Sequence, residues 1–495
     1  MKGPILEDDP PTIAQLRAVL ATAGYTVQAL QDLLGRTQLH WRPADVAIHE
    51  RRLPQGSQLA TLVRLFLLNL DTGIDHAARA LAPLRIEQLH ALGIAAIEAD
   101  SIRSRVQLVP CEDLVLACDR GRGEEDADVG AAHVTGVNPP AVHLAKMTVR
   151  RSVRDTLDVG TGGGIQALLA ARHSERVVGT DVNPRALNFA AFNARLNGID
   201  NVEWRLGSLF EPVRGEEFDL IVANPPYVIS PETQYLYRDS GRPGDSICRQ
   251  WVTEAPGHLR EGGFAQALIS WIPVADDWAQ PLRAWVANRG VDAWLLHYST
   301  EDPLSHASKW NQPQYECDVQ AFTQALDRWL DYYRSSGIEQ ISFGAVAMRR
   351  RSGRPNWLRA DEVVVPEVTA AGDHIARVFD AHERLADVPH DSDLLGIRCV
   401  LTADHRLEQT LIHRDGAWQP DSSMLCISRG LGFRGPLGSE TLRLLGFLDG
   451  ERTLGVALAE NARAMQMPPD DAAAYTVAAL PLVRRLIELG FLELR

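Results

Sequence analysis

Apolar residues recur at helical spacing through most of the first hundred positions of the chain. Leu16, Val19 and Leu20 illustrate the pattern, because residues three or four apart lie on one face of a helix. The next stretch, 106–119, has the apolar character of strands instead. The pattern predicts a mainly helical, winged-helix-like N-terminal domain at residues 1–105, with a hairpin after it.

Between about residues 150 and 350, short apolar runs alternate with helical stretches such as 184–197. The runs have the length and composition of strands: Thr156–Val159, Val177–Thr180, Val202–Leu206, Leu220–Ala223, Ala265–Ser270, Ala293–Tyr298 and Ile341–Met348. Strand–helix alternation is typical of a parallel sheet with helices on its faces. We therefore expect an α/β domain at 106–355, with a Rossmann-like sheet of seven mostly parallel strands. The stretch 300–340 is predicted to be a helical insertion.

The last region, 370–495, returns to helical spacing. We expect a helix at Pro481–Leu489, ended by Gly490 and followed by a strand at Phe491–Leu494. This order predicts a C-terminal winged-helix-like α+β domain, and a helical packing module is the alternative. The region carries no motif with chemistry, so partner recognition is its expected role.

Composition and charge narrow the classes of protein that the pattern allows. A chain of 495 residues is too long for one core and suggests about three domains. The proline-rich, acidic start is unlike a signal peptide, and no apolar run reaches the roughly 18 residues of a membrane helix. Six scattered cysteines without a CxxC pair indicate reduced thiols and no metal site. We expect a cytoplasmic protein without a membrane partner. The net charge of −14 disfavours nucleic-acid binding over the whole surface, although a local basic groove can still bind it.

A glycine-rich run follows the first predicted strand of the central domain. It reads DxGxGxG, with Asp158, Gly160, Gly162 and Gly164 at the fixed positions and Thr161 between the first two glycines. Glycines let a backbone pass close to a ligand, and the helix that follows offers unpaired N–H groups. The dinucleotide fingerprint GxGxxG fails, because its last position is an isoleucine. A purely structural turn is the alternative.

Asp181 ends the second predicted strand, directly before Val182. A carboxylate at the tip of this strand is placed to accept hydrogen bonds from both hydroxyls of a ribose. The alternative is that Asp181 caps the next helix.

The fourth strand runs into Asn224-Pro225-Pro226-Tyr227, beyond the carboxyl ends of the strands, where such sheets bind ligands. The Asn224 side-chain oxygen and the Pro225 carbonyl can accept both hydrogens of a planar NH₂ group. Prolines hold the acceptors in place, and the ring of Tyr227 can stack on the flat group. A proline turn without chemistry is the alternative.

Together these segments resemble the HemK family, the protein-glutamine N5-methyltransferases that act on release factors. The resemblance covers about residues 150–272 and includes Asn193 and Asn197 on a helix and the run 239–245. It implies a class I methyltransferase fold with S-adenosylmethionine (SAM) as cofactor. The implied cofactor-binding residues are Asp158, Gly160, Thr161, Gly162, Gly164, Asp181, Val182, Ser208, Leu209 and Asn224, and the implied catalytic residues are Asn224, Pro225, Pro226 and Tyr227. Similar enzymes often have an aspartate for the adenine amino group where this chain has Ser208.

The resemblance defines the reaction better than the substrate. Release-factor enzymes usually carry a Pro-Arg-Pro-x-Thr-Glu stretch before the glycine loop, and residues 136–143 here lack both its arginine and its acid. We expect a macromolecular substrate, first a glutamine amide in a release factor or ribosomal protein. The alternatives are an exocyclic base amine of rRNA, tRNA or DNA, and a regulatory SAM-binding protein without catalysis. Trp310 and Tyr315 are candidate walls of the substrate site.

Overall fold

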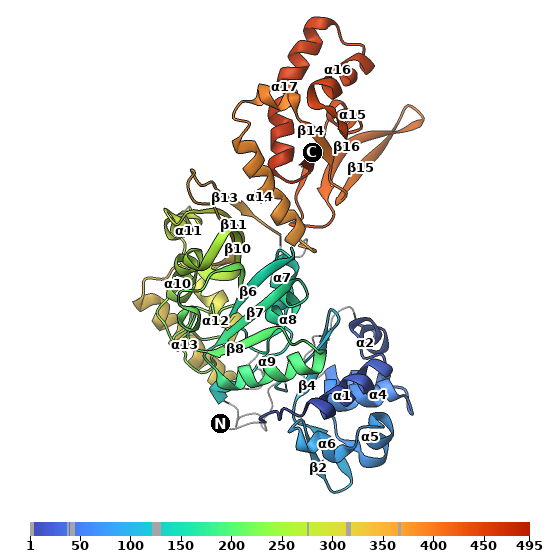
Figure 1. Cartoon of the computed structure of the whole chain (residues 1–495), viewed down its shortest axis with the longest axis vertical. Helices are drawn as coiled ribbons and strands as arrows, with labels where there is room; N and C mark the ends of the chain where they lie inside the picture. Colours follow the sequence, from blue (N-terminus) through green and yellow to red (C-terminus); the bar gives the residue numbers. More distant parts are fainter. Residues whose placement is uncertain are drawn as a thin grey trace. The chain divides into compact units, whose positions relative to one another are not determined.

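The structure is a computed structural model that describes residues 4–36, 39, 45–120, 130–274, 277–312, 318–364 and 368–495. The chain forms two compact units (Figure 1). The first contains Met1–Ala145 and Arg151–Asp361, and the second contains Lys146–Arg150 and Glu362–Arg495. Tyr315 lies outside the described residues.

The start of the first unit is mainly helical, with α1 (Pro10–Thr22), α2 (Val27–Leu34), α3 (Val46–Arg52), α4 (Gln58–Leu62), α5 (Ile74–Leu81) and α6 (Ile86–Ala91). A small sheet in the order β1 (Thr72–Gly73), β3 (Ser101–Ser104), β2 (Ala95–Glu98) accompanies the helices. The expected hairpin follows as β4 (Gln107–Cys111) and β5 (Leu114–Cys118). A division between domains at residue 105 and the winged-helix-like character of this block stay predictions.

The helical block shares a buried apolar cluster with helix α9 (Pro184–Asn197) of the central domain. Leu16 and Phe66 lie in this cluster together with Phe189. Two asparagines of α9 also bind the edge of the hairpin: the Asn193 side chain accepts from the backbone N–H of Ala117 (2.7 Å) and donates to its carbonyl (3.0 Å). Asn197 pairs in the same way with Val115 (2.9 and 2.8 Å). The paired asparagines therefore attach the hairpin to α9.

The centre of the first unit is an eight-stranded sheet in the order β13-β11-β12-β10-β9-β6-β7-β8. Its strands are β6 (Val153–Val159), β7 (Ser174–Asp181), β8 (Val202–Leu206), β9 (Phe218–Ala223), β10 (Leu259–Trp271), β11 (Val291–Glu301), β12 (Ile341–Arg350) and β13 (Leu358–Glu362). Strands β8, β7, β6, β9 and β10 are parallel, and β12 is antiparallel to both of its neighbours. Besides α9, the helices of this domain include α7 (Pro139–Met147), α8 (Ile165–Ala170), α10 (Ser246–Glu254) and α11 (Gln280–Val286).

The expected count of seven strands was one too few. The additional strand, β13, lies at the sheet edge and reads Leu-Arg-Ala-Asp-Glu, without the apolar alternation of a half-buried strand. It is held by side chains: the Trp294 indole N–H donates to the Asp361 carboxylate (2.7 Å), and the Arg359 guanidinium lies over the Trp294 ring. Trp294 and Asp361 are 67 residues apart, so their interaction leaves no local signal in the sequence.

Between β11 and β12 lies the expected helical insertion, formed by α12 (Pro303–Asn311) and α13 (Val319–Ser335). Asp302 caps α12 by accepting from the N–H groups of Leu304 (2.9 Å) and Ser305 (3.0 Å), and Pro303 suits the first helical position. The insertion is part of the same compact unit as the sheet.

The second unit contains α14 (Gly372–Ala386), α15 (Ser439–Leu445), α16 (Leu454–Ala464) and α17 (Pro469–Glu488). One sheet has the order β18 (Asp449–Thr453), β14 (Arg398–Leu401), β19 (Leu492–Leu494). The other has the order β15 (His405–Arg414), β16 (Ala417–Ile427), β17 (Arg434–Pro436). Helix α17 begins at Pro469, so the expected start at Pro481 was wrong: Pro481 lies inside the helix. The winged-helix-like classification of this unit stays a prediction. Within the described residues, no helix is long and apolar enough to cross a membrane.

Candidate active site

The glycine loop joins β6 to α8. Gly160 and Gly162 have φ angles of +73° and +54°, and a Cβ atom at either position would meet no atom within 4 Å. The loop therefore needs glycine for its conformation and has open space above it, which suits close approach of a ligand. Gly164 differs, because a Cβ there would meet Ala190 and Trp204 at 3.2 Å. Gly164 allows helix packing and does not line the cavity described below.

Asp158 lies buried beneath this loop. Its Oδ2 accepts hydrogen bonds from the Thr161 hydroxyl (2.6 Å) and the Ala167 backbone N–H (3.0 Å). The carboxyl group thus ties the glycine loop to the first turn of α8. Burial raises the pKa of Asp158 to about 7, although both hydrogen bonds act in the opposite direction.

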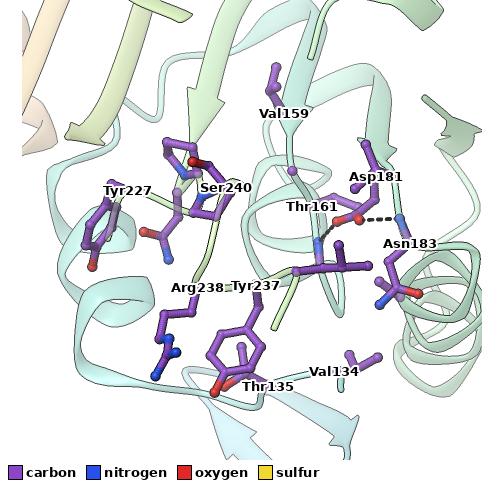
Figure 2. A pocket seen from close by; sticks show the side chains of 18 of the residues that line it. Val134, Thr135, Val159, Thr161, Asp181, Asn183, Tyr227, Tyr237, Arg238 and Ser240 are labelled. Atoms are coloured by element: carbon purple, nitrogen blue, oxygen red, sulfur yellow. Dashed lines mark hydrogen bonds between the residues drawn. The ribbon is translucent and has the colours of Figure 1, made fainter. Parts of the chain in front are cut away.

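Asp181 connects the end of β7 to the glycine loop. Its Oδ2 accepts from the Gly162 backbone N–H (2.8 Å) and its Oδ1 from the Asn183 backbone N–H (2.8 Å) (Figure 2). Burial raises the pKa of this carboxyl group, and the backbone hydrogen bonds partly counteract the rise. The carboxylate is therefore fixed in orientation before any ligand binds.

These loops line one cavity of about 500 Å³, which lies at the carboxyl ends of the parallel strands. Its lining includes most of the residues predicted for the site: Asp158, Gly160, Thr161, Gly162, Asp181, Val182, Ser208, Leu209, Asn224, Pro225, Pro226 and Tyr227. The glycine loop and the Asn-Pro-Pro-Tyr corner thus face a shared space, as their positions after β6 and β9 predicted.

The Asn224 side chain has an unusual environment within this cavity. Its Oδ1 is buried and has no hydrogen-bond partner among the residues that the structure describes. Leaving a buried carbonyl oxygen unsatisfied costs about 1–3 kcal/mol, so such an atom in a cavity wall indicates a donor that arrives with a ligand. The turn that carries it is held by the Ser270 hydroxyl, which donates to the Tyr227 carbonyl.

The ring of Tyr227 is largely covered by other aromatic side chains and is 8% exposed. The ring of Phe343 lies 5.1 Å away between centroids, and that of Trp310 lies 6.5 Å away at an interplanar angle of 72°. Burial raises the pKa of the Tyr227 phenol, which therefore stays neutral at physiological pH. Little of the Tyr227 ring surface therefore remains free to stack on a large planar group of a ligand.

Ser208 and Leu209 form the cavity wall after β8. Leu209 has a φ angle of +49°, a left-handed conformation that branched side chains rarely adopt. The Thr180 hydroxyl donates to its carbonyl (3.4 Å). The strained backbone therefore fixes the direction of the peptide groups at Ser208 and Leu209.

Several lining residues were missed at the sequence level. His133, Val134 and Thr135 come from a segment that contains no motif, and Figure 2 shows Val134 and Thr135 on the rim of the pocket. Tyr237 and Arg238 come from the loop after the Asn-Pro-Pro-Tyr corner. The family-like run 239–245 was the available signal for that loop.

Of the aromatic residues proposed as substrate walls, Trp310 lines the cavity. Among the described residues, no group of three or more His, Cys, Asp or Glu side chains is arranged to hold a metal ion. The described cysteines are buried free thiols.

Comparison with known proteins agrees with this geometry. A family model described as a methyltransferase small domain matches residues 138–269, and a domain of unknown function, DUF7059, matches residues 22–105. The chain is 34% identical over 137 residues to a Methanocaldococcus jannaschii protein named as a protein N5-glutamine methyltransferase, covering 26% of this chain and 68% of that one.

Two further relatives are bacterial. Identity is 37% over 132 residues to a release factor glutamine methyltransferase of Xylella fastidiosa, covering 24% of this chain and 48% of the relative. It is 35% over 179 residues to a ribosomal protein uL3 glutamine methyltransferase of Xanthomonas campestris, covering 32% and 56%. The chain thus spans about half the length of these two relatives.

The strand order, with one antiparallel strand between β10 and β11, and the cavity beyond the parallel strands define a class I methyltransferase. The chain belongs to the HemK-like methyltransferases.

Proposed function

We propose that this protein uses SAM to methylate the side-chain amide nitrogen of a glutamine in a protein of the translation apparatus. The buried, unpaired Oδ1 of Asn224 is the observation that carries the proposal. A primary amide offers two N–H donors on a flat group, and these donors suit the unpaired Asn224 oxygen and the neighbouring Pro225 carbonyl. The relatives named for release-factor and uL3 glutamine methylation support the choice of acceptor.

The cavity has the features that SAM requires. About 500 Å³ lies within the range of small-molecule sites, and the open space above Gly160 and Gly162 suits the close approach of an amino-acid moiety. The fixed carboxylate of Asp181 suits a ribose diol, and the wall at Ser208 and Leu209 suits the adenine ring. When bound, SAM supplies an electrophilic methyl group on a sulfonium.

The chain's own residues orient the acceptor. With the amide hydrogens held by Asn224 and Pro225, its nitrogen is fixed relative to the glycine loop, and such positioning accounts for up to about 7–11 kcal/mol of barrier reduction in favourable cases. The neutral phenol of Tyr227 and its aromatic neighbours provide an uncharged wall beside this group. No residue must act as a strong base, because the proton can leave to solvent after transfer.

The covered ring of Tyr227 favours an amide over a nucleobase. A base amine in this position needs a wide aromatic face for stacking, and Phe343 and Trp310 already occupy the surroundings of the Tyr227 ring. A glutamine side chain is narrow and places only its terminal amide at the site. We accordingly place the protein in the cytoplasm, where such substrates are made and used.

Two variants with opposite defects test the assignment. Asn224→Ala is expected to keep SAM affinity in calorimetry and to lose methyl transfer. Asp181→Ala is expected to weaken SAM binding by about 1.5–3 kcal/mol, the scale of a charge-assisted hydrogen bond. Full transfer activity of Asn224→Ala, or unchanged SAM affinity of Asp181→Ala, would contradict the roles given to these residues.

The acceptor is tested with radiolabelled SAM and lysate from a strain that lacks the enzyme. The label is expected to be released by protease, to survive nuclease and to appear as N5-methylglutamine in mass spectrometry. Loss of the label on nuclease treatment would replace the glutamine with a base amine. Asn224→Ala in the same lysate is the matched control for background labelling.

A further inference from the structure

The helical insertion α12–α13 is joined by hydrogen bonds to the segment that follows the Asn-Pro-Pro-Tyr corner. The Tyr333 hydroxyl donates to the Ile229 carbonyl (2.8 Å), and the Gly244 backbone N–H donates to the Tyr332 hydroxyl (2.9 Å). These contacts lie at both ends of the segment 229–244. The insertion is therefore attached along the whole loop that borders the acceptor side of the cavity.

A third attachment lies between these two. The Glu232 carboxylate accepts from the Trp329 indole N–H (3.3 Å) and from the Arg328 guanidinium (3.1 Å). Both donors lie on α13, one residue apart, so a single carboxylate fixes the helix to the loop. The Trp329 ring is fully buried.

Arg238 makes the fourth connection, and it does so from the cavity wall. Its guanidinium binds the Asp239 carboxylate in a bidentate pair (2.8 and 3.0 Å), donates to the Trp310 carbonyl (3.5 Å) and lies 5.7 Å from the centre of the Trp329 ring. Both Arg238 and Asp239 are 3% exposed. A buried ion pair of this kind tolerates little displacement, because separating the charges would leave one of them without compensation.

Trp310, at the end of α12, is the residue that this arrangement brings into the cavity. Its ring meets the Tyr227 ring edge-on, at 6.5 Å between centroids. The His306 ring, on the same helix, lies 6.3 Å from it, and its Nδ1 pairs with the Glu301 carboxylate at 3.1 Å. The indole therefore has two ring neighbours, Tyr227 and His306.

We infer, on the basis of the proposed function, that the insertion α12–α13 forms the acceptor wall and that Trp310 determines acceptor specificity. The Trp310 and Tyr227 rings are in edge contact, so they cannot enclose a nucleobase between two parallel faces, which needs ring planes about 7 Å apart. They leave a narrow approach that admits a planar amide on a thin aliphatic stem. The acceptor selected in this way is a single side chain on a protruding protein loop.

Steady-state kinetics with purified release factor as acceptor give the first test. Trp310→Ala is expected to raise the acceptor KM at least tenfold, with kcat changed less than threefold and affinity for S-adenosylhomocysteine unchanged. Trp310→Phe is expected to restore most of the lost affinity. The control Trp278→Ala removes an indole that lies outside the cavity and stacks on His297, and its acceptor KM should match that of the wild type.

A second measurement does not depend on catalysis. In protein labelled with 5-fluorotryptophan and saturated with S-adenosylhomocysteine, N-acetylglutamine amide is expected to shift the Trp310 fluorine resonance, identified with Trp310→Phe, and to leave that of Trp278 in place. Cytidine as a nucleoside probe should shift neither resonance.

The outcomes separate the two proposals. An amide that shifts the Trp310 resonance while no glutamine is methylated would overturn the proposed function and keep the wall. Methylation of glutamine with an unchanged KM in Trp310→Ala and an unmoved Trp310 resonance would overturn the wall and keep the proposed function. A shift caused by cytidine would overturn the specificity given to Trp310.

Discussion

At the scale of single residues, Asp158 shows how burial at the site affects stability. Its pKa is raised from 3.8 to about 7, so folding favours the protonated carboxyl group. The stability that it contributes is complete below pH 3.8 and is lost as the pH rises through about 7. Asp158→Asn has no such loss, so its free energy of unfolding should improve relative to the wild type by up to about 1.4 kcal/mol per pH unit in this window.

Urea unfolding of both proteins at intervals between pH 4 and pH 8 measures this difference. Asp181 contributes a dependence of the same sign, since burial also raises its pKa; it is present in both proteins and cancels in the comparison apart from its charge interaction with Asp158. Parallel stability profiles of wild type and Asp158→Asn would mean that the carboxyl group is ionised in the folded protein throughout the range.

The residue scale is also where the sequence predicted the site best. The DxGxGxG run, Asp181 and Asn224 each belong to a recognisable local sequence pattern. Their common position at the carboxyl ends of the parallel strands therefore followed from the predicted strands. Arg238 and Trp310 could not be paired in advance, because 72 residues separate them and their contact exists only after the insertion folds back. A lone arginine after a proline turn has no pattern that indicates burial.

At the scale of elements, a buried ion pair lies beside the part of the cavity wall that contains Val134. Arg185 of α9 binds Asp119, which follows β5, and the side chains are 0% and 3% exposed. The Arg185 Nε also donates to the Pro4 carbonyl (3.2 Å), and Asp119 accepts from the Val134 N–H (2.7 Å). One pair therefore joins the N-terminal segment, the hairpin and the cavity wall at Val134.

Removing one partner of this pair should be strongly destabilising. Arg185→Met leaves the Asp119 carboxylate buried without its guanidinium partner, and the contact to His133 Nδ1 at 3.7 Å is too long to replace it, so we expect a loss of about 3–5 kcal/mol in the free energy of unfolding. The control Arg334→Met breaks the exposed pair with Asp331, whose side chains are 75% and 73% exposed, and should lose at most about 1 kcal/mol. Equal losses in denaturant unfolding would show that Asp119 is solvated after the substitution.

Elements with a clear pattern of apolar residues were predicted from the sequence. Elements that depend on contacts with distant residues were not. The central strands read as apolar runs and are present in the structure, whereas β13 depends on Arg359 and Asp361 binding Trp294. The start of α17 was misplaced because proline suits a first turn, and Pro481 instead lies within a helix of 20 residues. Twelve residues precede Pro481 in α17 and include several alanines, whose helix propensity offsets the missing N–H bond.

At the scale of the whole molecule, the compact units are not consecutive stretches of the chain. Lys146–Arg150 belongs to the second unit, although the residues on both sides of it belong to the first. The segment joins the second unit through its backbone: the Ala371 N–H donates to the Lys146 carbonyl at 2.6 Å, at the start of α14. The second unit is therefore built from two separate parts of the chain, which a division of the sequence into consecutive domains cannot express.

Gly372 lies at this junction and allows a test of it. A Cβ at Gly372 would stand 2.1 Å from the Thr148 carbonyl oxygen, so Gly372→Ala must move α14 or the segment 146–150. Helix propensity alone predicts a gain of about 1 kcal/mol for this substitution. Overpacking predicts a loss of about 1–3 kcal/mol, and we expect the loss, measured by urea unfolding. Gly396→Ala, where a Cβ would meet no atom within 4 Å, should change stability little. A stabilised Gly372→Ala protein would show that residues 146–150 do not pack against α14, because the sign of the change depends on that contact alone.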